Sequence, residues 1–214
     1  MTTSSNSIEM EARALCEAAR WCAARGWVPA TSGNFSVRDA HVGQFLISRS
    51  GLDKGQMTTA DLLVLDTAGH VVRGPASGGT AMPSAETALH VVIYRYRHEA
   101  KAILHVHTVW NTLIGARFAG AGLFKITGYE LLKALDGVAT HEHHEVVPVL
   151  GNSQEYVELS AQLTEVLRGN PGAHGVLLSG HGLYTWGRSV EDARRHLDAL
   201  EFLFEVEGRR IFGH

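Results

Sequence analysis

The sequence predicts an α/β layered domain whose sheet is not purely parallel, and three observations lead to this prediction. Two early segments, 35–48 and 61–73, alternate apolar and polar residues on either side of a short turn, which is typical of β-hairpins. Residues 8–25 and 189–212 carry apolar side chains at helical spacing. Between them, helical segments separate further apolar strands, as crossover helices do in layered sheets.

The first half of the chain is expected to hold both hairpins between two helices. Gly26 ends the first helix, and Ser84 is the expected N-cap of the second. In order, the predicted elements are a helix at 8–25, strands at 35–38, 44–48, 61–66 and 69–73, and a helix at 83–95.

The second half is expected to alternate strands with helices. Its first strand has an apolar centre, Ala102-Ile103-Leu104, and runs into two histidines. In order, the predicted elements are a strand at 101–107, helices at 109–116 and 129–135, a strand at 146–150, a helix at 153–168, a strand at 175–179 and a helix at 189–212.

Length and composition favour one ordinary globular domain. The 214 residues are 45% hydrophobic and 19% charged, and no repeat, low-complexity tract or long linker divides them, so we expect a single domain over 1–214. A net charge of −3 without a basic stripe argues against nucleic acid and anionic membrane as partners. No apolar run reaches the roughly 18–20 residues that cross a bilayer. The polar start of the chain is unlike a secretory signal, and Cys16 and Cys22 have neither disulfide-framework nor redox-pair spacing, so we expect a cytoplasmic protein.

Three histidines carry the strongest chemical signal. Residues two apart in a strand point to the same side, so His105 and His107 should aim both imidazoles at one point. His181 stands between two glycines directly after the apolar strand at 175–179, where the backbone can turn sharply. Three imidazole nitrogens with a fourth position left open are typical of catalytic zinc. A lone His-X-His arises by chance more often than not in a histidine-rich chain, so the prediction depends on the combination.

Three turns rich in small residues come before the histidines. They are Thr31-Ser32-Gly33-Asn34, Ser48-Arg49-Ser50-Gly51 and Pro83-Ser84-Ala85-Glu86. Such turns offer hydroxyls and free backbone N–H groups, which can hold a phosphate, with Arg49 and Lys54 as countercharge. Each turn taken alone is more often an ordinary turn. None matches a nucleotide-binding glycine pattern, so a nucleotide cofactor is not indicated.

The order of these five motifs resembles the class II aldolase/adducin family, over about residues 10–210. The resemblance implies a single-domain α/β/α sandwich around a mostly antiparallel sheet, and a homo-tetramer with active sites near subunit interfaces. It further implies one Zn²⁺ per subunit and a small phosphorylated sugar as substrate. By resemblance, zinc would be held by His105, His107 and His181, and Glu86 would be the acid/base carboxylate beside it. The phosphate would be bound by Thr31, Gly33, Asn34, Ser50, Gly51 and Ser84.

Two further segments are similar to one subgroup of this family, the methylthioribulose-1-phosphate dehydratases of methionine salvage. They are residues 124–130 with the following Leu-Leu-Lys, and residues 140–154. The subgroup's proposed catalytic glutamate falls on Glu130. The resemblance therefore implies a zinc-dependent hydro-lyase, in which Glu130 protonates the departing C4 hydroxyl and Glu86 is the base or the alternative acid. The histidines at 141–144 are more often structural or solvated than a second metal site.

Two other functions remain open from the sequence. A sugar-phosphate aldolase or 4-epimerase, like L-fuculose-phosphate aldolase, would share the metal but act on a C–C bond. A non-catalytic scaffold domain like the adducin head would keep only the fold, and the intact set of three histidines argues against it.

Overall fold

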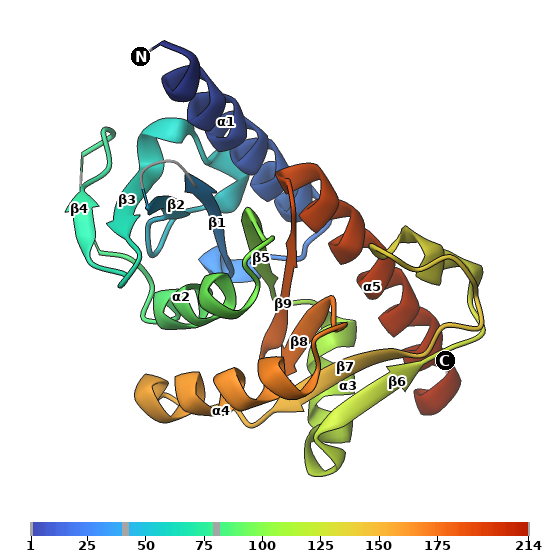
Figure 1. The fold of residues 1–214 in the computed structure, drawn as a ribbon. Coiled ribbons are helices and arrows are strands. Elements are labelled where there is room, and N and C mark those ends of the chain that lie inside the picture. The colour runs from blue at the N-terminus through green and yellow to red at the C-terminus, as the bar shows by residue number, and fades with distance from the viewer. Residues whose placement is uncertain (1, 40–42, 79–81, 214) are drawn as a thin grey trace.

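The computed structural model describes residues 2–39, 43–78 and 82–213, with side chains described from residue 8 onward. Within these residues, a nine-stranded sheet runs in the order β4-β3-β2-β1-β5-β9-β8-β7-β6 (Figure 1). β7 and β8 are parallel, and the other neighbouring strands are antiparallel. The mostly antiparallel sheet is therefore confirmed.

The elements are bounded as follows. The strands are β1 (Asn34–Asp39), β2 (Gln44–Ser48), β3 (Leu62–Asp66), β4 (Val71–Arg73), β5 (Ala102–Val106), β6 (Leu123–Ile126), β7 (Glu145–Leu150), β8 (Gly175–Leu178) and β9 (Gly182–Gly187). The α-helices are α1 (Thr2–Ala24), α2 (Thr87–Tyr96), α3 (Val109–Phe118), α4 (Tyr156–Gly169) and α5 (Val190–Phe212). The short 3-10 helices are η1 (Pro29–Thr31), η2 (Lys54–Gln56), η3 (Thr59–Asp61), η4 (Ala119–Ala121) and η5 (Glu130–Ala134).

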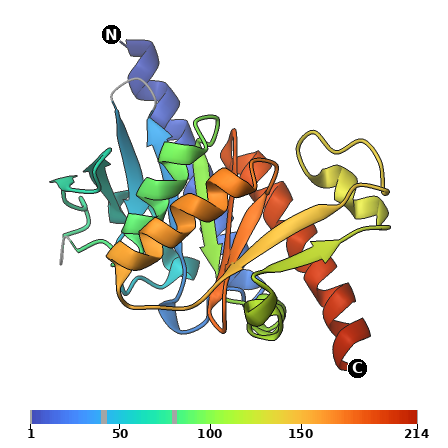
Figure 2. The same ribbon diagram turned by 60° about the horizontal axis from the view of Figure 1, so that its bottom comes forward.

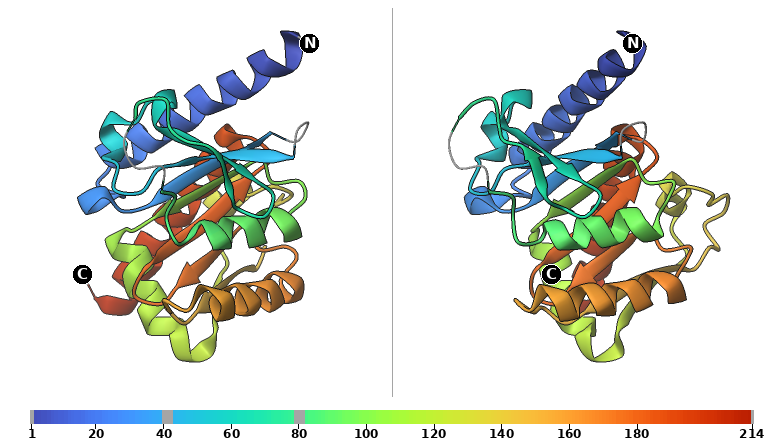
Figure 3. Two further views of the ribbon diagram at one scale, coloured as in Figure 1. Left: turned by 90° about the vertical axis from the view of Figure 1, so that its left-hand side faces the viewer. Right: turned by 60° about the vertical axis from the view of Figure 1, so that its left-hand side comes forward.

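Helices cover both faces of the sheet, so the predicted α/β/α layering is confirmed. Figure 2 shows α2 and α4 side by side in front of the sheet, with α1 and α5 behind it, and Figure 3 shows the same layers from two further sides. Because side chains alternate along a strand, β5 supplies Leu104 to the core under α1 and α5 and Ile103 to the core under α2 and α4. Both side chains are completely buried, which fixes β5 in the middle of the molecule.

The predicted hairpins and the long terminal helices are confirmed. β1 pairs with β2 and β3 pairs with β4. The first helix ends before Gly26, whose φ is +70°, and Ser189 caps α5 by accepting a hydrogen bond from the Asp192 N–H. Among the described residues, no helix is both long and apolar enough to cross a membrane.

The start predicted for the helix at 83–95 was wrong. α2 begins at Thr87, and Glu86 rather than Ser84 is its N-cap residue. Pro83 forms an isolated bridge with Arg49, which keeps the chain extended there, and the Ser84 hydroxyl accepts from the Glu86 N–H at 3.3 Å within a turn.

Two strands, β6 and β9, were not predicted. β9 lies between β5 and β8 and is buried along its whole length. It therefore pairs with β5, which carries His105, and begins directly after the turn that carries His181.

Candidate metal centre and active site

The three predicted ligand histidines come together where β5 ends and β9 begins. His105 lies in β5, and His107 is the first residue after that strand. Their rings lie on the same face of the sheet with centroids 4.6 Å apart. His181 is in the turn between β8 and β9, after Gly180 with φ of +63°. Nε2 of His107 lies 2.8 Å from Nε2 of His105 and 3.1 Å from Nε2 of His181.

Glu86 joins this group from the N-terminus of α2. Its Oε1 lies 2.9 Å from Nε2 of His181, and its Oε2 lies 3.6 Å from Nε2 of His105. One ligand atom from each of the four residues lies within 4.8 Å of every other. The four side chains thus form one compact set of nitrogen and oxygen donors, which we call the histidine cluster.

Contacts on the far sides of the rings orient the histidine cluster. Nδ1 of His105 lies 3.0 Å from the Leu183 carbonyl, and Nδ1 of His181 lies 3.1 Å from Oδ1 of Asn152. The His105 ring also stacks on Tyr184 at 3.9 Å. In a neutral imidazole, a proton donated from Nδ1 leaves Nε2 as an acceptor, so both rings present lone pairs inward.

This donor arrangement fits a divalent metal ion. The inward Nε2 of His181 faces a carboxylate oxygen of Glu86, and two acceptors at 2.9 Å repel unless a cation or a proton lies between them. Imidazole nitrogen suits zinc, copper, iron and nickel. The second ring nitrogen of a ligand histidine is commonly held by an oxygen, as it is here for His105 and His181. The residues could therefore hold a transition metal.

Burial keeps the ligands in the protonation states that a metal requires. It lowers the pKa of His105 well below the usual value and that of His107 to about 4, so both rings are neutral near pH 7. Burial alone would raise the pKa of Glu86, but its polar contacts with the His181 and His105 imidazoles and with the Asn34 amide outweigh burial and lower the pKa overall. The cluster therefore combines the neutral imidazoles of His105 and His107 with an ionised carboxylate.

The start of β1 packs directly against the end of β5. A Cβ at Gly33 would lie 2.6 Å from the His105 carbonyl oxygen, and the φ of Gly33 is +73°, so glycine is required on both counts. Asn34 pairs with His105 across the strands, and its Nδ2 donates to Oε2 of Glu86 at 2.5 Å. Gly33 and Asn34, predicted to bind phosphate, are thus brought to the cluster, and the Asn34 side chain is committed to Glu86.

The three predicted phosphate turns are linked to each other. Lys54, only 2% exposed, donates to the carbonyls of Thr31 at 3.0 Å and Leu52 at 2.9 Å, which joins the first turn to the second. The N–H of Ser50 donates to the Met82 carbonyl at 3.0 Å, which joins the second turn to the segment that leads to the third. Gly51, with φ of +68°, and Ser84 are less buried than Lys54.

Lys54 is a buried cation close to the histidine cluster. Across the described ranges, no carboxylate lies within ion-pair distance of its Nζ, whereas Arg49 pairs with Asp61 at 3.5 Å. Burial lowers the pKa of Lys54 to about 8, so the amine is largely charged at pH 7. A buried charge without a counter-ion is costly, and a bound anion would relieve that cost.

Glu130 lies outside the histidine cluster. Its side chain is 72% exposed, contacts Lys133, and lies 3.7 Å from Nδ1 of His141. Its catalytic role stays a prediction. Among the neighbouring histidines, His143 pairs with the buried Glu145 at 3.0 Å.

Sequence reasoning missed the supporting residues Asn152, Tyr184 and His90. Of the three, His90 was the easiest to predict from the sequence. It follows Glu86 by four residues, a spacing that places two side chains on one face of a helix. Asn152 and Tyr184 carry no comparable local pattern.

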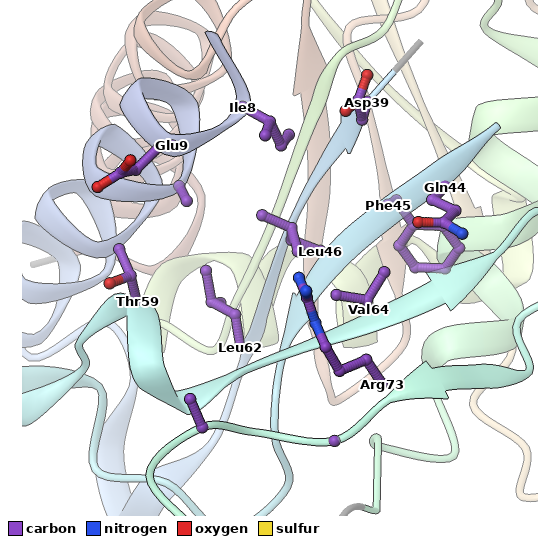
Figure 4. Close-up of a pocket in the computed structure, with 13 residues that line it drawn as sticks. Ile8, Glu9, Asp39, Gln44, Phe45, Leu46, Thr59, Leu62, Val64 and Arg73 are labelled. Carbon is purple, nitrogen blue, oxygen red and sulfur yellow. The ribbon is translucent and has the colours of Figure 1, made fainter. Parts of the chain in front are cut away.

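A separate cavity of about 500 Å³ lies between α1 and strands β1 to β4 (Figure 4). Its walls are mostly apolar, with Leu46, Leu62 and Val64 on the sheet and Ile8 on α1, and Glu9 and Arg73 also line it. None of the histidine cluster residues lines it. The cavity is therefore separate from the histidine cluster, whose donor set is the reason for placing the chemistry there.

Comparisons with known proteins agree with this site. The profile of the Class II Aldolase and Adducin N-terminal domain matches residues 13–207, a range that contains every site residue described above. The methylthioribulose-1-phosphate dehydratase of Methylococcus capsulatus is 46% identical over 203 residues, which cover 94% of this chain and 95% of that protein. The dehydratase of the same name from Enterobacter sp. is 45% identical over 195 residues, covering 91% and 92%. The structure of L-fuculose-1-phosphate aldolase from Thermus thermophilus has a TM-score of 0.71 at 25% identity, covering 93% of this chain and 94% of that one.

Proposed function

The chain belongs to the class II aldolase and adducin family, and from this premise we propose that it dehydrates 5-methylthioribulose 1-phosphate. The product is 2,3-diketo-5-methylthiopentyl 1-phosphate, and the reaction belongs to methionine salvage. The observation that carries the choice of dehydration over C–C cleavage is the 46% identity with a dehydratase over 94% of the chain. The geometry of the histidine cluster supports metal-assisted chemistry in either case.

His105, His107 and His181 would hold one divalent ion per subunit, for which we propose zinc. The close approach of their Nε2 atoms supports this assignment. When bound, the ion supplies Lewis acidity that stabilises the negative charge developed on the sugar oxygens. The protein supplies the proton transfers and holds the substrate.

Two carboxylates divide the proton transfers in this proposal. Glu86 takes the proton from C3, since it is the ionised carboxylate of the histidine cluster and lies 2.9 Å from Nε2 of His181. Protonation of the C4 hydroxyl lets it leave as water, and the resulting enol then becomes the 2,3-diketone. We assign this second step to Glu130. Because the exposed Glu130 lies outside the histidine cluster of its own chain, it would act in the site of a second copy of the chain, within the homo-tetramer that we propose.

The phosphate would sit among the three linked turns. Lys54 supports this position, because its ammonium has three N–H donors and two of them are used on the carbonyls of Thr31 and Leu52. The third donor remains for an anion. Thr31, Gly33, Ser50, Gly51 and Ser84 would supply further donors, and the side chain of Asn34 would act through Glu86 instead.

Turnover of two substrates tests the proposal. The protein is loaded with Zn²⁺ and incubated with 5-methylthioribulose 1-phosphate or with L-fuculose 1-phosphate, and the products are identified by ¹³C NMR. We expect the diketone from the first substrate and no cleavage of the second. Cleavage of L-fuculose 1-phosphate into two fragments would favour an aldolase, the function of the structurally similar Thermus thermophilus protein. No turnover of either, with zinc retained, would favour a scaffold domain.

A further inference from the structure

A chain of buried hydrogen bonds leads from the histidine cluster into the space between α2 and the sheet. It starts with the Asn34 amide on Oε2 of Glu86. Oδ1 of Asn34 contacts Nε2 of His90, and Nδ1 of His90 lies 2.7 Å from the Ser36 hydroxyl. Ser36 Oγ lies 2.8 Å from Oη of Tyr94. Asn34, Ser36, His90 and Tyr94 are between 0% and 6% exposed, so water does not interrupt the chain.

The contacts fix the direction of every proton in this chain. Burial lowers the pKa of His90 to about 3, so the ring is neutral and has one donor and one acceptor. A proton on Nδ1 would leave the lone pair of Nε2 against the Asn34 oxygen. Turning the Asn34 amide over would remove that conflict but would place its oxygen against the Glu86 carboxylate. The proton of His90 is therefore on Nε2.

The remaining protons follow from this tautomer. Nδ1 of His90 accepts from the Ser36 hydroxyl, and Ser36 in turn accepts from Tyr94, whose Oη also lies 3.3 Å from the Lys101 carbonyl. Every bond from Tyr94 to Asn34 thus donates toward Glu86. The chain ends at Tyr94, which is only 6% exposed and gives its single proton to Ser36, so we assign the chain to orienting groups rather than to conducting protons.

We propose that His90 is a positioning residue for the dehydration: its Nε2–H holds the Asn34 amide so that Asn34 donates to Oε2 of Glu86 at the histidine cluster. Without that hydrogen bond the Asn34 amide can rotate, and the carboxylate loses its fixed donor. The inference rests on the proposed function in one respect, that Glu86 takes part in the reaction. Residues that hydrogen-bond to the groups around a metal site typically contribute a factor of about 10–100 in activity or metal affinity.

Two substitutions of His90 separate positioning from simple packing. Gln keeps one N–H donor and one oxygen acceptor, whereas Leu keeps bulk alone. We expect His90→Leu to lower kcat about 10–100-fold with KM changed less than about two-fold, and His90→Gln to recover most of that loss. Leu163→Ala, which removes core packing in α4 on the same face of the sheet, serves as the control for lost stability and should keep kcat. A wild-type kcat for His90→Leu, or a His90→Gln variant equally impaired, would overturn the proposal.

The tautomer can be observed without any substrate. Long-range ¹H–¹⁵N spectra of the ¹⁵N-labelled, metal-free protein distinguish a protonated ring nitrogen from a bare one, and loss of a signal in His90→Gln assigns His90. We expect a neutral ring with its proton on Nε2 at pH 7. A proton on Nδ1, or on both nitrogens, would overturn the proposal even if the protein proves to be a dehydratase. Confirmation of the tautomer beside an inactive protein would instead count against the proposed function.

Discussion

Lys54→Met tests the phosphate site, because it removes the buried ammonium while keeping most of the side-chain volume. A hydrogen bond to a charged group contributes about 1.5–3 kcal/mol net. At about 1.4 kcal/mol for each factor of ten, losing one such bond to the phosphate raises KM about 10- to 150-fold. Substrate and transition state carry the same phosphate, so kcat should change little. Initial rates over a range of 5-methylthioribulose 1-phosphate concentrations give both constants.

Lys125→Met is the matched control, since Lys125 is an exposed residue of β6 and its loss changes net charge equally. Melting curves of both variants exclude unfolding as the cause of a raised KM. The wild-type protein provides a further check. The pKa of Lys54 is lowered to about 8 in the free protein, so the ammonium is present below that pH and lost above it. KM should therefore rise above about pH 8 in the wild type and not in Lys54→Met. A KM within two-fold of the wild type for Lys54→Met would refute the assignment.

Three further substitutions, one of them with a matched control, test the candidate metal centre, the turn beside it and the acid. His181→Ala should lower zinc content and dehydration together while the fold survives; full zinc retention by elemental analysis would remove His181 from the site. Gly33→Ala should abolish activity and lower the melting temperature, because its Cβ would lie 2.6 Å from the His105 carbonyl oxygen. A Cβ at Gly51 would meet open space, so the control Gly51→Ala should lower the free energy of unfolding by only the roughly 1–2 kcal/mol that a left-handed backbone costs a non-glycine residue. Equal damage from Gly33→Ala and Gly51→Ala would contradict the steric argument. Glu130→Gln should lower kcat about 10²–10⁴-fold with zinc unchanged, and a near wild-type kcat would leave the acid role to another group.

Local patterns in the sequence were sufficient to predict how the three candidate metal ligands are presented. The period of two along a strand placed His105 and His107 on one face, and the glycines around His181 indicated the turn that carries it. The structure brings all three together. The hairpins of β1–β2 and β3–β4 were equally predictable, because each joins residues that are close in the chain.

Features that depend on distant pairing were not predictable from such patterns. β9 forms a hairpin with β8, and its aromatic and β-branched centre was a local signal that the sequence analysis missed. Its pairing with β5, which lies far earlier in the chain, has no such local signal. The hydrogen bond from Asn34 to Glu86 joins residues 52 positions apart. Asn34 was expected to bind phosphate as part of a turn. Its role beside Glu86 becomes visible only when β1 lies against β5.

Zinc titration of the metal-free protein tests the central claim most directly, that the histidine cluster holds the ion on which dehydration depends. Metal is removed with a chelator, Zn²⁺ is added back in steps, and the diketone formed from 5-methylthioribulose 1-phosphate is measured at each step. We predict no diketone without metal, a linear rise to one equivalent of zinc per chain, and no rise for His181→Ala. Full diketone formation by the metal-free protein, or recovery of His181→Ala at one equivalent, would contradict the claim.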